Sequence, residues 1–335
     1  MNKRKMFLVL YLFIITSTIT AQVKWVNVDS SFEPLPSSVH VYKTTDLLDG
    51  KPNIAYYVEA DLKDRDLIFA ADTSQDRRLK PSQFYEKEKA LIVVNCTFFS
   101  FETNRSLNAV IKDGKLVAYN QHTIPGRGKD TLTYRHPLGS AIGISKKRKA
   151  DIAWTYTDSM YKYPVAYENY PLLIKDSSLA VQRSIFYPHF IHSLIVLNKQ
   201  QLKKQEGILD KWKMQTAVGG GPVLLQNGDI KITNNEEWKF AGKAIDDKHP
   251  RTAMGYTKDN KLIILVIEGR NPGKAEGANL KQEAQLLKDI GCREALNLDG
   301  GGSTCMLVNG KETIKVSDAE GQRPVPAVFI IKRKK

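Results

Sequence analysis

The chain is dominated by short β-rich runs separated by turn dipeptides, and this alternation constrains its fold more than any other feature. The clearest runs cover residues 90–99, 107–111, 116–119 and 262–268. The pairs that accept the φ > 0 conformations of a tight hairpin turn are Asp113-Gly114, Asn227-Gly228, Asn309-Gly310 and Asp259-Asn260. The sequence therefore predicts an α+β fold: a β-rich mixed sheet with hairpins and a few crossover helices, in a single large domain.

One helix is predicted over residues 280–290. Its apolar face is formed by Leu280, Ala284, Leu287 and Ile290. Asn279 with Gln282 forms a capping box, and Gly291 stands where a left-handed C-terminal residue is needed. Because the helix joins a strand ending near 268 to a strand over 295–298, we expect a crossover between parallel neighbours.

The first 21 residues are typical of a secretory signal peptide. A basic stretch, 2–5, precedes an apolar run, 6–15, that is too short to span a bilayer. No cysteine follows the run, so we expect a protein without a lipid anchor, periplasmic or secreted. The predicted organisation is a signal peptide (1–21), an N-terminal extension (22–53) and one domain (54–332) with an insertion at about 155–200.

Loss of the signal peptide lowers the formal net charge from +14 to +11. A basic excess suits nucleic acid, an anionic surface, or phosphate- and carboxylate-bearing substrates, and export argues against nucleic acid. The basic runs 146–149 and 332–335 are interpreted as solvated faces, since no aromatic residues are interleaved with them. No transmembrane span is expected.

No cofactor and no metal site are predicted. Among the six histidines only His189 and His192 are close in sequence, and their neighbours are not helical. Calcium bound by carboxylates and carbonyls leaves little trace in a sequence and stays open. Cys96, Cys292 and Cys305 can form at most one disulfide, and a free, buried thiol is expected for Cys96.

Two glycine runs are the most specific motifs. Gly300, Gly301 and Gly302 follow Asp299 at a strand end and precede Ser303 and Thr304. Consecutive glycines are entropically costly to order, so they mark tight backbone geometry or close approach to a ligand, although a plain turn between strands is the alternative. No lysine follows, which excludes a P-loop. The second run includes Gly220 and Gly221 and ends at Pro222.

Three further strand ends carry polar groups. Asn95 and Thr97 stand beside Phe98 and Phe99, Arg251 and Thr252 begin a strand, and Glu268 ends one. Arginine suits bidentate phosphate recognition. The alternative for each is an ordinary strand end.

The chain resembles the phosphodiester glycosidase family over about residues 54–332. The resemblance rests on five motifs that occur in the family's order: 95–99, 219–222, 250–255, 268–270 and 298–303. A mammalian member of that family removes N-acetylglucosamine from mannose 6-phosphate diesters. Gln282 stands where many relatives carry an acid, and Glu283 follows it, so no catalytic role is assigned there.

The resemblance implies an exported hydrolase that cleaves the glycosidic C–O bond of a sugar 1-phosphodiester. Its oxocarbenium-like transition state suits two carboxylates, and Asp299 and Glu268 are the predicted pair. One of them can suffice as base or nucleophile, since a phosphomonoester leaves readily. The predicted substrate and phosphate ligands are Arg251, Thr252, Asn95, Thr97, Gly220, Gly221, Gly300, Gly301, Gly302 and Ser303. The alternatives are a non-catalytic carbohydrate-binding envelope protein and hydrolysis at phosphorus.

Overall fold

The computed structural model describes residues 22–74, 77–126, 134–135, 137–159, 161–167 and 210–334. The predicted signal peptide and residues 168–200 of the predicted insertion lie outside the described residues.

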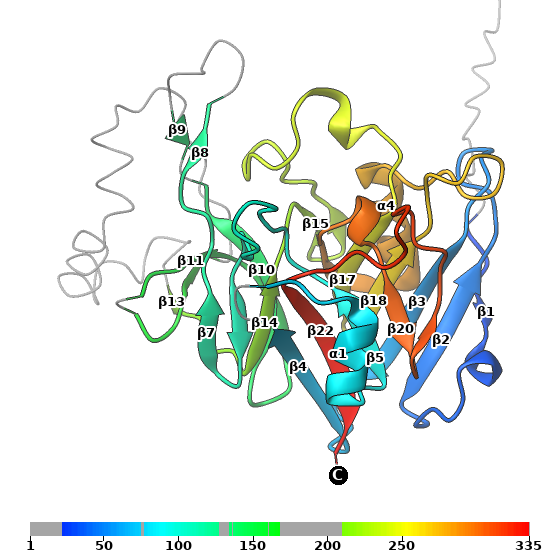
Figure 1. Cartoon of the computed structure of the whole chain (residues 1–335), viewed down its shortest axis with the longest axis horizontal. Helices are drawn as coiled ribbons and strands as arrows, with labels where there is room; N and C mark the ends of the chain where they lie inside the picture. Colours follow the sequence, from blue (N-terminus) through cyan, green and yellow to red (C-terminus); the bar gives the residue numbers. More distant parts are fainter. Residues whose placement is uncertain are drawn as a thin grey trace, which may run out of the picture.

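Three large sheets build the described part of the molecule (Figure 1). The eight-stranded sheet has the order β1 (Val26–Asn27), β2 (Val39–Thr44), β3 (Ala55–Asp61), β18 (Lys261–Ile267), β17 (Arg251–Thr257), β19 (Cys292–Asn297), β15 (Val223–Gln226) and β16 (Asp229–Ile230). The seven-stranded sheet has the order β13 (Asp210–Lys211), β12 (Val165–Tyr167), β11 (Ala150–Tyr156), β10 (Gly139–Ile144), β14 (Thr216–Gly219), β6 (Val110–Lys112) and β7 (Lys115–Ala118). The five-stranded sheet has the order β21 (Lys311–Glu312), β20 (Met306–Val308), β5 (Ile92–Asn95), β22 (Ala327–Arg333) and β4 (Leu67–Thr73).

The smaller elements complete the described part of the chain. Strands β8 (Ile124–Pro125) and β9 (Tyr134–Arg135) pair with each other. The α-helices are α1 (Pro81–Glu88) and α4 (Leu280–Ile290), and 3-10 turns cover Asp29–Ser31, Gly242–Ile245 and Gly301–Ser303. The predicted α+β, β-rich class is confirmed.

The predicted hairpins are confirmed. β6 and β7, β15 and β16, β17 and β18, and β20 and β21 are antiparallel pairs joined at the four dipeptides. Asp113, Asn227 and Asn309 have φ of 52°, 55° and 48°, and the glycine after each is also at positive φ. Asparagine, aspartate and glycine tolerate this left-handed region, which is why these pairs place the turns.

The helix is confirmed, but the strands it joins are not neighbours. The Asn279 side chain accepts from the Gln282 N–H, and Gly291 ends the helix at φ 100°. β17 lies between β18 and β19 and is antiparallel to both, so these two strands are parallel but one strand apart. Helix α1 makes the same kind of crossover from β4 to β5, with β22 between them. The strand directly before β18 fills the first gap and the C-terminal strand fills the second, which the helix sequences do not reveal.

The main core lies between the three sheets, and each helix seals an outer face. Strand β18 shows the arrangement: Ile264 and Val266 face the shared core, whereas Ile263 and Leu265 pack with Ala284 and other α4 residues. Burial on both faces explains the uninterrupted apolar run from 262 to 267. Helix α1 covers the five-stranded sheet through Phe84, which packs with Val93 and Val328.

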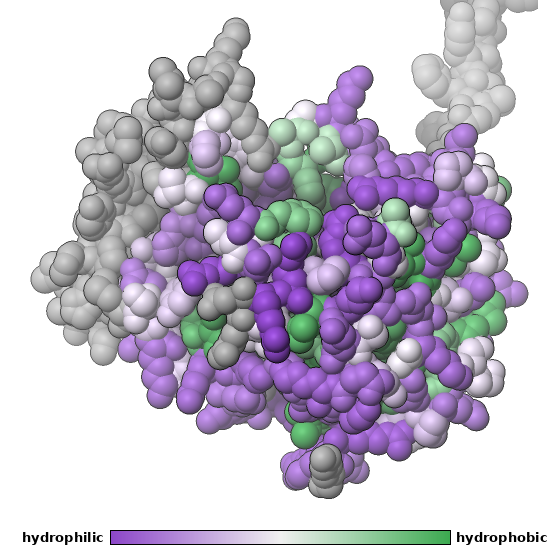
Figure 2. Space-filling view, viewed as in Figure 1, coloured by the Kyte–Doolittle hydropathy of each residue, from purple (hydrophilic) through white to green (hydrophobic). Residues whose placement is uncertain are grey.

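Residues 22–53, treated above as an extension, supply β1 and β2 to the eight-stranded sheet, and β2 pairs with β3 along its whole length. On the face shown in Figure 2 the surface is mainly hydrophilic, and hydrophobic residues are scattered. No helix in the described ranges is long and apolar enough to cross a membrane.

Candidate functional site

The predicted motifs lie where the chain passes from one sheet to another. Residues 96–109 lead from β5 to β6, residues 220–222 from β14 to β15, and residues 298–305 from β19 to β20. These three crossings meet. The Asp299 N–H donates to the Cys96 carbonyl at 2.8 Å, and the Gly221 N–H donates to the Asn297 carbonyl at 2.7 Å. The topology therefore brings to one place three motifs that together span more than 200 residues of the sequence.

The glycine loop after Asp299 packs tightly over the start of β17. The Gly301 N–H donates to the Pro250 carbonyl at 2.8 Å, and a Cβ on Gly300 would lie 2.7 Å from that same oxygen. A Cβ on Gly302 would lie 2.1 Å from Nη2 of Arg323. Close approach to backbone at one glycine and to a guanidinium at another explains why this run contains no side chains.

Two arginines border this loop, and neither was among the predicted site residues. The guanidinium of Arg270 lies over Gly301, 3.0 Å from where a Cβ would stand. Arg323 lies against Gly302, donates through Nε to Asp318 at 2.7 Å, and stacks 5.6 Å from the Phe101 ring centroid. Arg270 is exposed and Arg323 half-buried, so both can reach a ligand. Arg270 belongs to the 268–270 motif, whereas Arg323 has no local sequence signal.

Asp299 keeps some exposure, yet its carboxyl group is largely desolvated. Burial raises the pKa of Asp299 to about 7, against the opposing effects of the Ser303 hydroxyl, the Arg323 guanidinium and the Gly300 N–H. A carboxyl that exchanges its proton near neutrality is suited to general acid–base catalysis.

Glu268, the other predicted carboxylate, is buried and held by two donors. Oε1 accepts from Asn271 Nδ2 and Oε2 from the Lys315 N–H, both at 3.0 Å. Ser317, two residues after Lys315, donates to the Gly301 carbonyl at 3.3 Å. One short segment thus links Glu268 to the glycine loop, and each carboxylate oxygen retains capacity for a further donor.

The other glycine run is closed by the protein itself. The N–H groups of Gly219, Gly220 and Gly221 donate to the carbonyls of Ala109, Ser140 and Asn297. A Cβ on Gly220 would lie 2.5 Å from the Asn297 oxygen, and Gly221 has φ 119°. The phosphate-binding role predicted for Gly220 and Gly221 through their amides is not supported by these contacts.

Asn95, Thr97 and Thr252 are buried and bind other parts of the protein. Asn95 Nδ2 donates to the Asp299 carbonyl at 2.5 Å, and Oδ1 accepts from Thr252 Oγ1 at 3.0 Å. Thr97 Oγ1 lies 2.9 Å from Ser106 Oγ. These side chains hold the crossings together around Asp299.

Arg251, the leading phosphate candidate, is 3% exposed. Its Nε donates to the Ala278 carbonyl at 2.8 Å and Nη2 to the Asp247 carbonyl at 3.1 Å. A guanidinium committed to backbone carbonyls in the interior is not offered to a substrate, so these contacts do not support the predicted role.

Behind Arg251 lies a buried acid that the sequence analysis set aside. Glu283 falls on the apolar face of α4, and its two carboxylate oxygens have no hydrogen-bond partner among the described residues. Burial raises the pKa of Glu283 to about 8, and Arg251 acts against this. The sequence already indicated that Glu283 lies on the apolar face, because it stands three residues after Leu280 and four before Leu287.

Polar atoms without partners gather near the loop. Besides Glu283, the buried atoms lacking a hydrogen bond within the described ranges include Nδ1 of His249, Oδ1 of Asn297 and Oγ1 of Thr304. Buried polar groups are normally satisfied, so such a cluster is typical of a functional site.

A cavity of about 230 Å³ opens beside the crossings. Phe98, Trp238 and Phe240 supply aromatic walls, and Asn108, Asn120 and Gln121 supply amides. Asn108 also donates to the Gly220 carbonyl at 3.3 Å, which places the cavity beside the 219–221 run. Its volume is below the roughly 300–1,000 Å³ of sites for drug-sized ligands. Aromatic faces with a few amides suit one sugar ring.

Lys239 also lines this cavity, with Nζ 5.5 Å from the Phe98 ring centroid. Burial lowers its pKa, and Glu237 opposes the shift. No motif around this lysine indicates a functional role.

The described residues contain no group of three or more candidate metal ligands. Cys96, Cys292 and Cys305 are all buried free thiols, as expected for Cys96.

Residues 189–332 match the phosphodiester glycosidase family. The resemblance drawn from the motifs is therefore confirmed. The chain is also 30% identical over 115 residues to N-acetylglucosamine-1-phosphodiester alpha-N-acetylglucosaminidase of Mus musculus. That alignment covers 32% of this chain and 22% of the mouse protein.

Solved structures share the fold over much more of the chain. The zebrafish N-acetylglucosamine-1-phosphodiester alpha-N-acetylglucosaminidase catalytic domain, auto-inhibited by its pro-peptide, superposes with a TM-score of 0.55 at 20% identity. The superposition covers 94% of this chain and 89% of that domain. A Burkholderia pseudomallei protein, provisionally described as exported, superposes with a TM-score of 0.56 at 15% identity. The superposition covers 84% of this chain and 74% of the Burkholderia chain.

Proposed function

We propose that this protein is an exported hydrolase that cleaves the glycosidic C–O bond of a sugar 1-phosphodiester. It would release the sugar from a phosphate-linked glycan or envelope component. The observation that carries the proposal is Asp299, a desolvated carboxyl with a pKa of about 7, in a glycine loop bordered by two arginines. The family match over residues 189–332 supports the same chemistry.

In this proposal Arg270 and Arg323 bind the phosphodiester. Their guanidinium groups lie against Gly301 and Gly302, where the absence of a side chain lets them approach the loop backbone closely. Arginine forms paired, charge-assisted hydrogen bonds to phosphate oxygens, and these would stabilise charge that builds on the leaving group. Gly300 and Ser303 shape the same loop.

Asp299 is proposed to act as the base. It takes a proton from water as the water oxygen bonds to C1, while the C1–O bond breaks and its electron pair leaves with the phosphate. The products are the free sugar and a phosphomonoester, and the proton passes from Asp299 to solvent. Because the phosphate is a good leaving group, no strong general acid is needed. The Glu268 carboxylate would stabilise positive charge at the sugar ring.

The sugar is proposed to occupy the cavity beside Phe98. Its aromatic walls would contact the ring faces, and the exposed amide of Gln121 would bind hydroxyl or acetamido groups.

The test is to incubate the protein and an Asp299→Asn variant with sugar 1-phosphate methyl esters in ¹⁸O-labelled water. We expect the wild type to release sugar carrying the label and unlabelled methyl phosphate, and the variant to be at least about 10³-fold slower. Label in the phosphate would instead indicate hydrolysis at phosphorus. Binding without turnover by both proteins would indicate the carbohydrate-binding alternative.

A further inference from the structure

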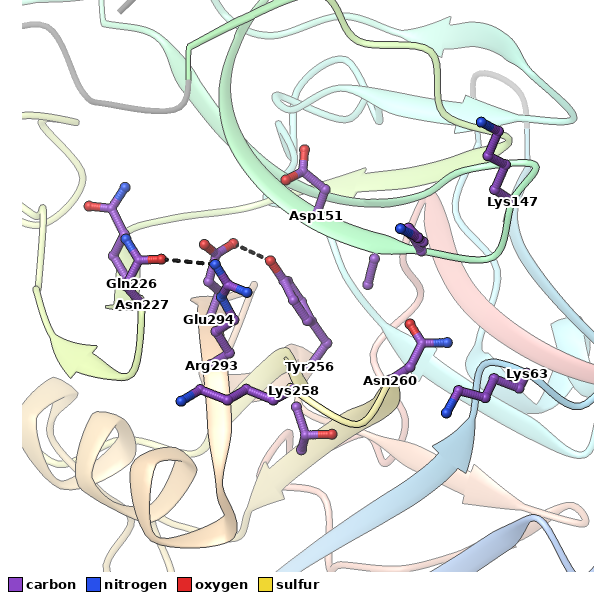
Figure 3. Close-up of a pocket in the computed structure, with 13 residues that line it drawn as sticks. Lys63, Lys147, Asp151, Gln226, Asn227, Tyr256, Lys258, Asn260, Arg293 and Glu294 are labelled. Atoms are coloured by element: carbon purple, nitrogen blue, oxygen red, sulfur yellow. Dashed lines mark hydrogen bonds between the residues drawn. The ribbon is translucent and has the colours of Figure 1, made fainter. Parts of the chain in front are cut away.

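A second pocket lies at the opposite end of the strands that carry the candidate site (Figure 3). β17 begins at Arg251, below the glycine loop, and ends at Thr257, which lines this pocket. Seven residues of strand span roughly 20 Å, so the two sites are distinct. The pocket has a volume of about 740 Å³, and its cationic lining residues are Lys63, Lys147, Lys149, Lys258 and Arg293.

One half-buried arginine organises this pocket. Arg148 donates to the carbonyls of Leu62, at 2.5 Å, Leu67, at 3.1 Å, and Asp64, and its own carbonyl accepts from Asn260 at 3.3 Å. These bonds tie together the β3–β4, β10–β11 and β17–β18 turns. Because those turns carry the pocket's lysines, the lysines are held around one space despite their separation in sequence. The basic run 146–149 is therefore not simply a solvated face.

Among the described residues, none of the five cations forms an ion pair with a carboxylate. Arg293 donates to the Asn227 side chain at 3.3 Å. Several lysines elsewhere form ion pairs, as in Lys261–Asp61 at 3.0 Å. Concentrated, unpaired positive charge raises the local concentration of anions.

The two acids of the pocket are bound by neighbouring aromatic residues. Asp151 Oδ2 accepts from Trp212 Nε1, and Glu294 Oε2 accepts from the Tyr256 hydroxyl, each at 2.6 Å. Even if both are ionised, five cations face two carboxylates. The pocket therefore keeps a positive excess.

We propose that this pocket binds a ligand that carries several phosphate groups along a chain. Its volume exceeds that of one phosphate, and lysines on three turns present separate point charges rather than one paired clamp. Binding at this pocket does not depend on the hydrolytic function proposed above.

The test is calorimetric titration with inorganic tripolyphosphate and, separately, with orthophosphate. In one variant the lysines of the pocket, Lys63, Lys147, Lys149 and Lys258, are replaced by glutamine. A control variant has the same charge change at exposed positions elsewhere, Lys51, Lys89, Lys115 and Lys281. We expect the pocket variant to bind tripolyphosphate about thirtyfold more weakly and the control to bind within about twofold of wild type. Orthophosphate should bind far more weakly than tripolyphosphate.

Three results would overturn the proposal. Equal losses in the pocket and control variants would show a response to net charge alone. Loss on Arg270→Gln with Arg323→Gln, and none in the pocket variant, would place the anion at the glycine loop. Equal affinities for orthophosphate and tripolyphosphate would exclude a site for several phosphates.

Discussion

The two glycine runs look alike in sequence and differ in what surrounds them. Both follow a strand and both carry the chain from one sheet to another. The 219–221 run is filled by protein: its three N–H groups donate to carbonyls, and backbone stands where a Gly220 side chain would be. The 300–302 run is bordered by the tips of Arg270 and Arg323 and by a desolvated carboxyl.

The comparison shows that a glycine run predicts close approach, not what approaches. At Gly220 the neighbour is backbone, which cannot move without shifting a strand. At Gly302 it is the end of a flexible side chain. The first run supports the fold, and the second leaves guanidinium donors beside an acid, which is what an anion-binding site requires.

The largest expected effect is a loss of turnover when the two arginines that border the 300–302 run are changed. Arg270→Gln combined with Arg323→Gln should lower kcat/KM by about 10² to 10³-fold, because charge on the departing phosphate loses its donors. Steady-state kinetics on a sugar 1-phosphate ester measures this. Lys274→Gln and Lys315→Gln, which remove the same charge nearby, serve as the control and should change the rate little.

A substitution in the 219–221 run should instead lower the stability of the folded protein. Gly220→Ala places a methyl group 2.5 Å from the Asn297 carbonyl and should cost about 1–3 kcal/mol of unfolding free energy. Denaturant unfolding measures the loss. An unchanged midpoint would mean that the crossing is looser than described.

Gly302→Ala is the matched change in the second run. Its methyl group displaces the Arg323 guanidinium, so we expect a small change in stability and a rise in KM of about tenfold, the size of one charge-assisted contact. The same unfolding and kinetic assays apply. If Gly302→Ala were as destabilising as Gly220→Ala, the distinction between the two runs would fail.

The smallest effect concerns Glu283, beneath the start of β17. Its pKa is raised on folding, so the folded state favours the protonated carboxyl; this stabilisation is complete at acid pH and is lost as pH rises through about 8. Glu283→Gln removes the ionisable carboxyl and therefore this loss of stability at higher pH. Thermal unfolding at pH 5 and pH 9 should show the variant gaining stability over wild type as pH rises. A difference independent of pH would contradict the assigned ionisation.

The sequence predicted the local features of the fold well, because local chemistry determines them. The hairpin turns and both ends of α4 depend on residues within a few positions of one another. The order of strands in the sheets depends on long-range pairing, so the strand inserted between β18 and β19 could not be inferred from the helix that joins them.

For the site, the motifs indicated which loops matter but not which side chains face the ligand. Asp299 and the glycines after it lie together as expected. Arg251 has the residue type for phosphate binding, yet it points into the protein, whereas Arg323 comes from a loop without any motif. Side-chain direction at a sheet junction is set by packing from three sheets, which one sequence does not display.

The central claim is that Asp299 is the reacting carboxylate, and the dependence of kcat/KM on pH tests it most directly. With a sugar 1-phosphate methyl ester, which does not titrate near neutrality, the account predicts that kcat/KM rises through an apparent pKa of about 7 and then levels off. The residual rate of Asp299→Asn should lack that rise. A wild-type inflection confined to about pH 4, or an unchanged profile in Asp299→Asn, would contradict the account.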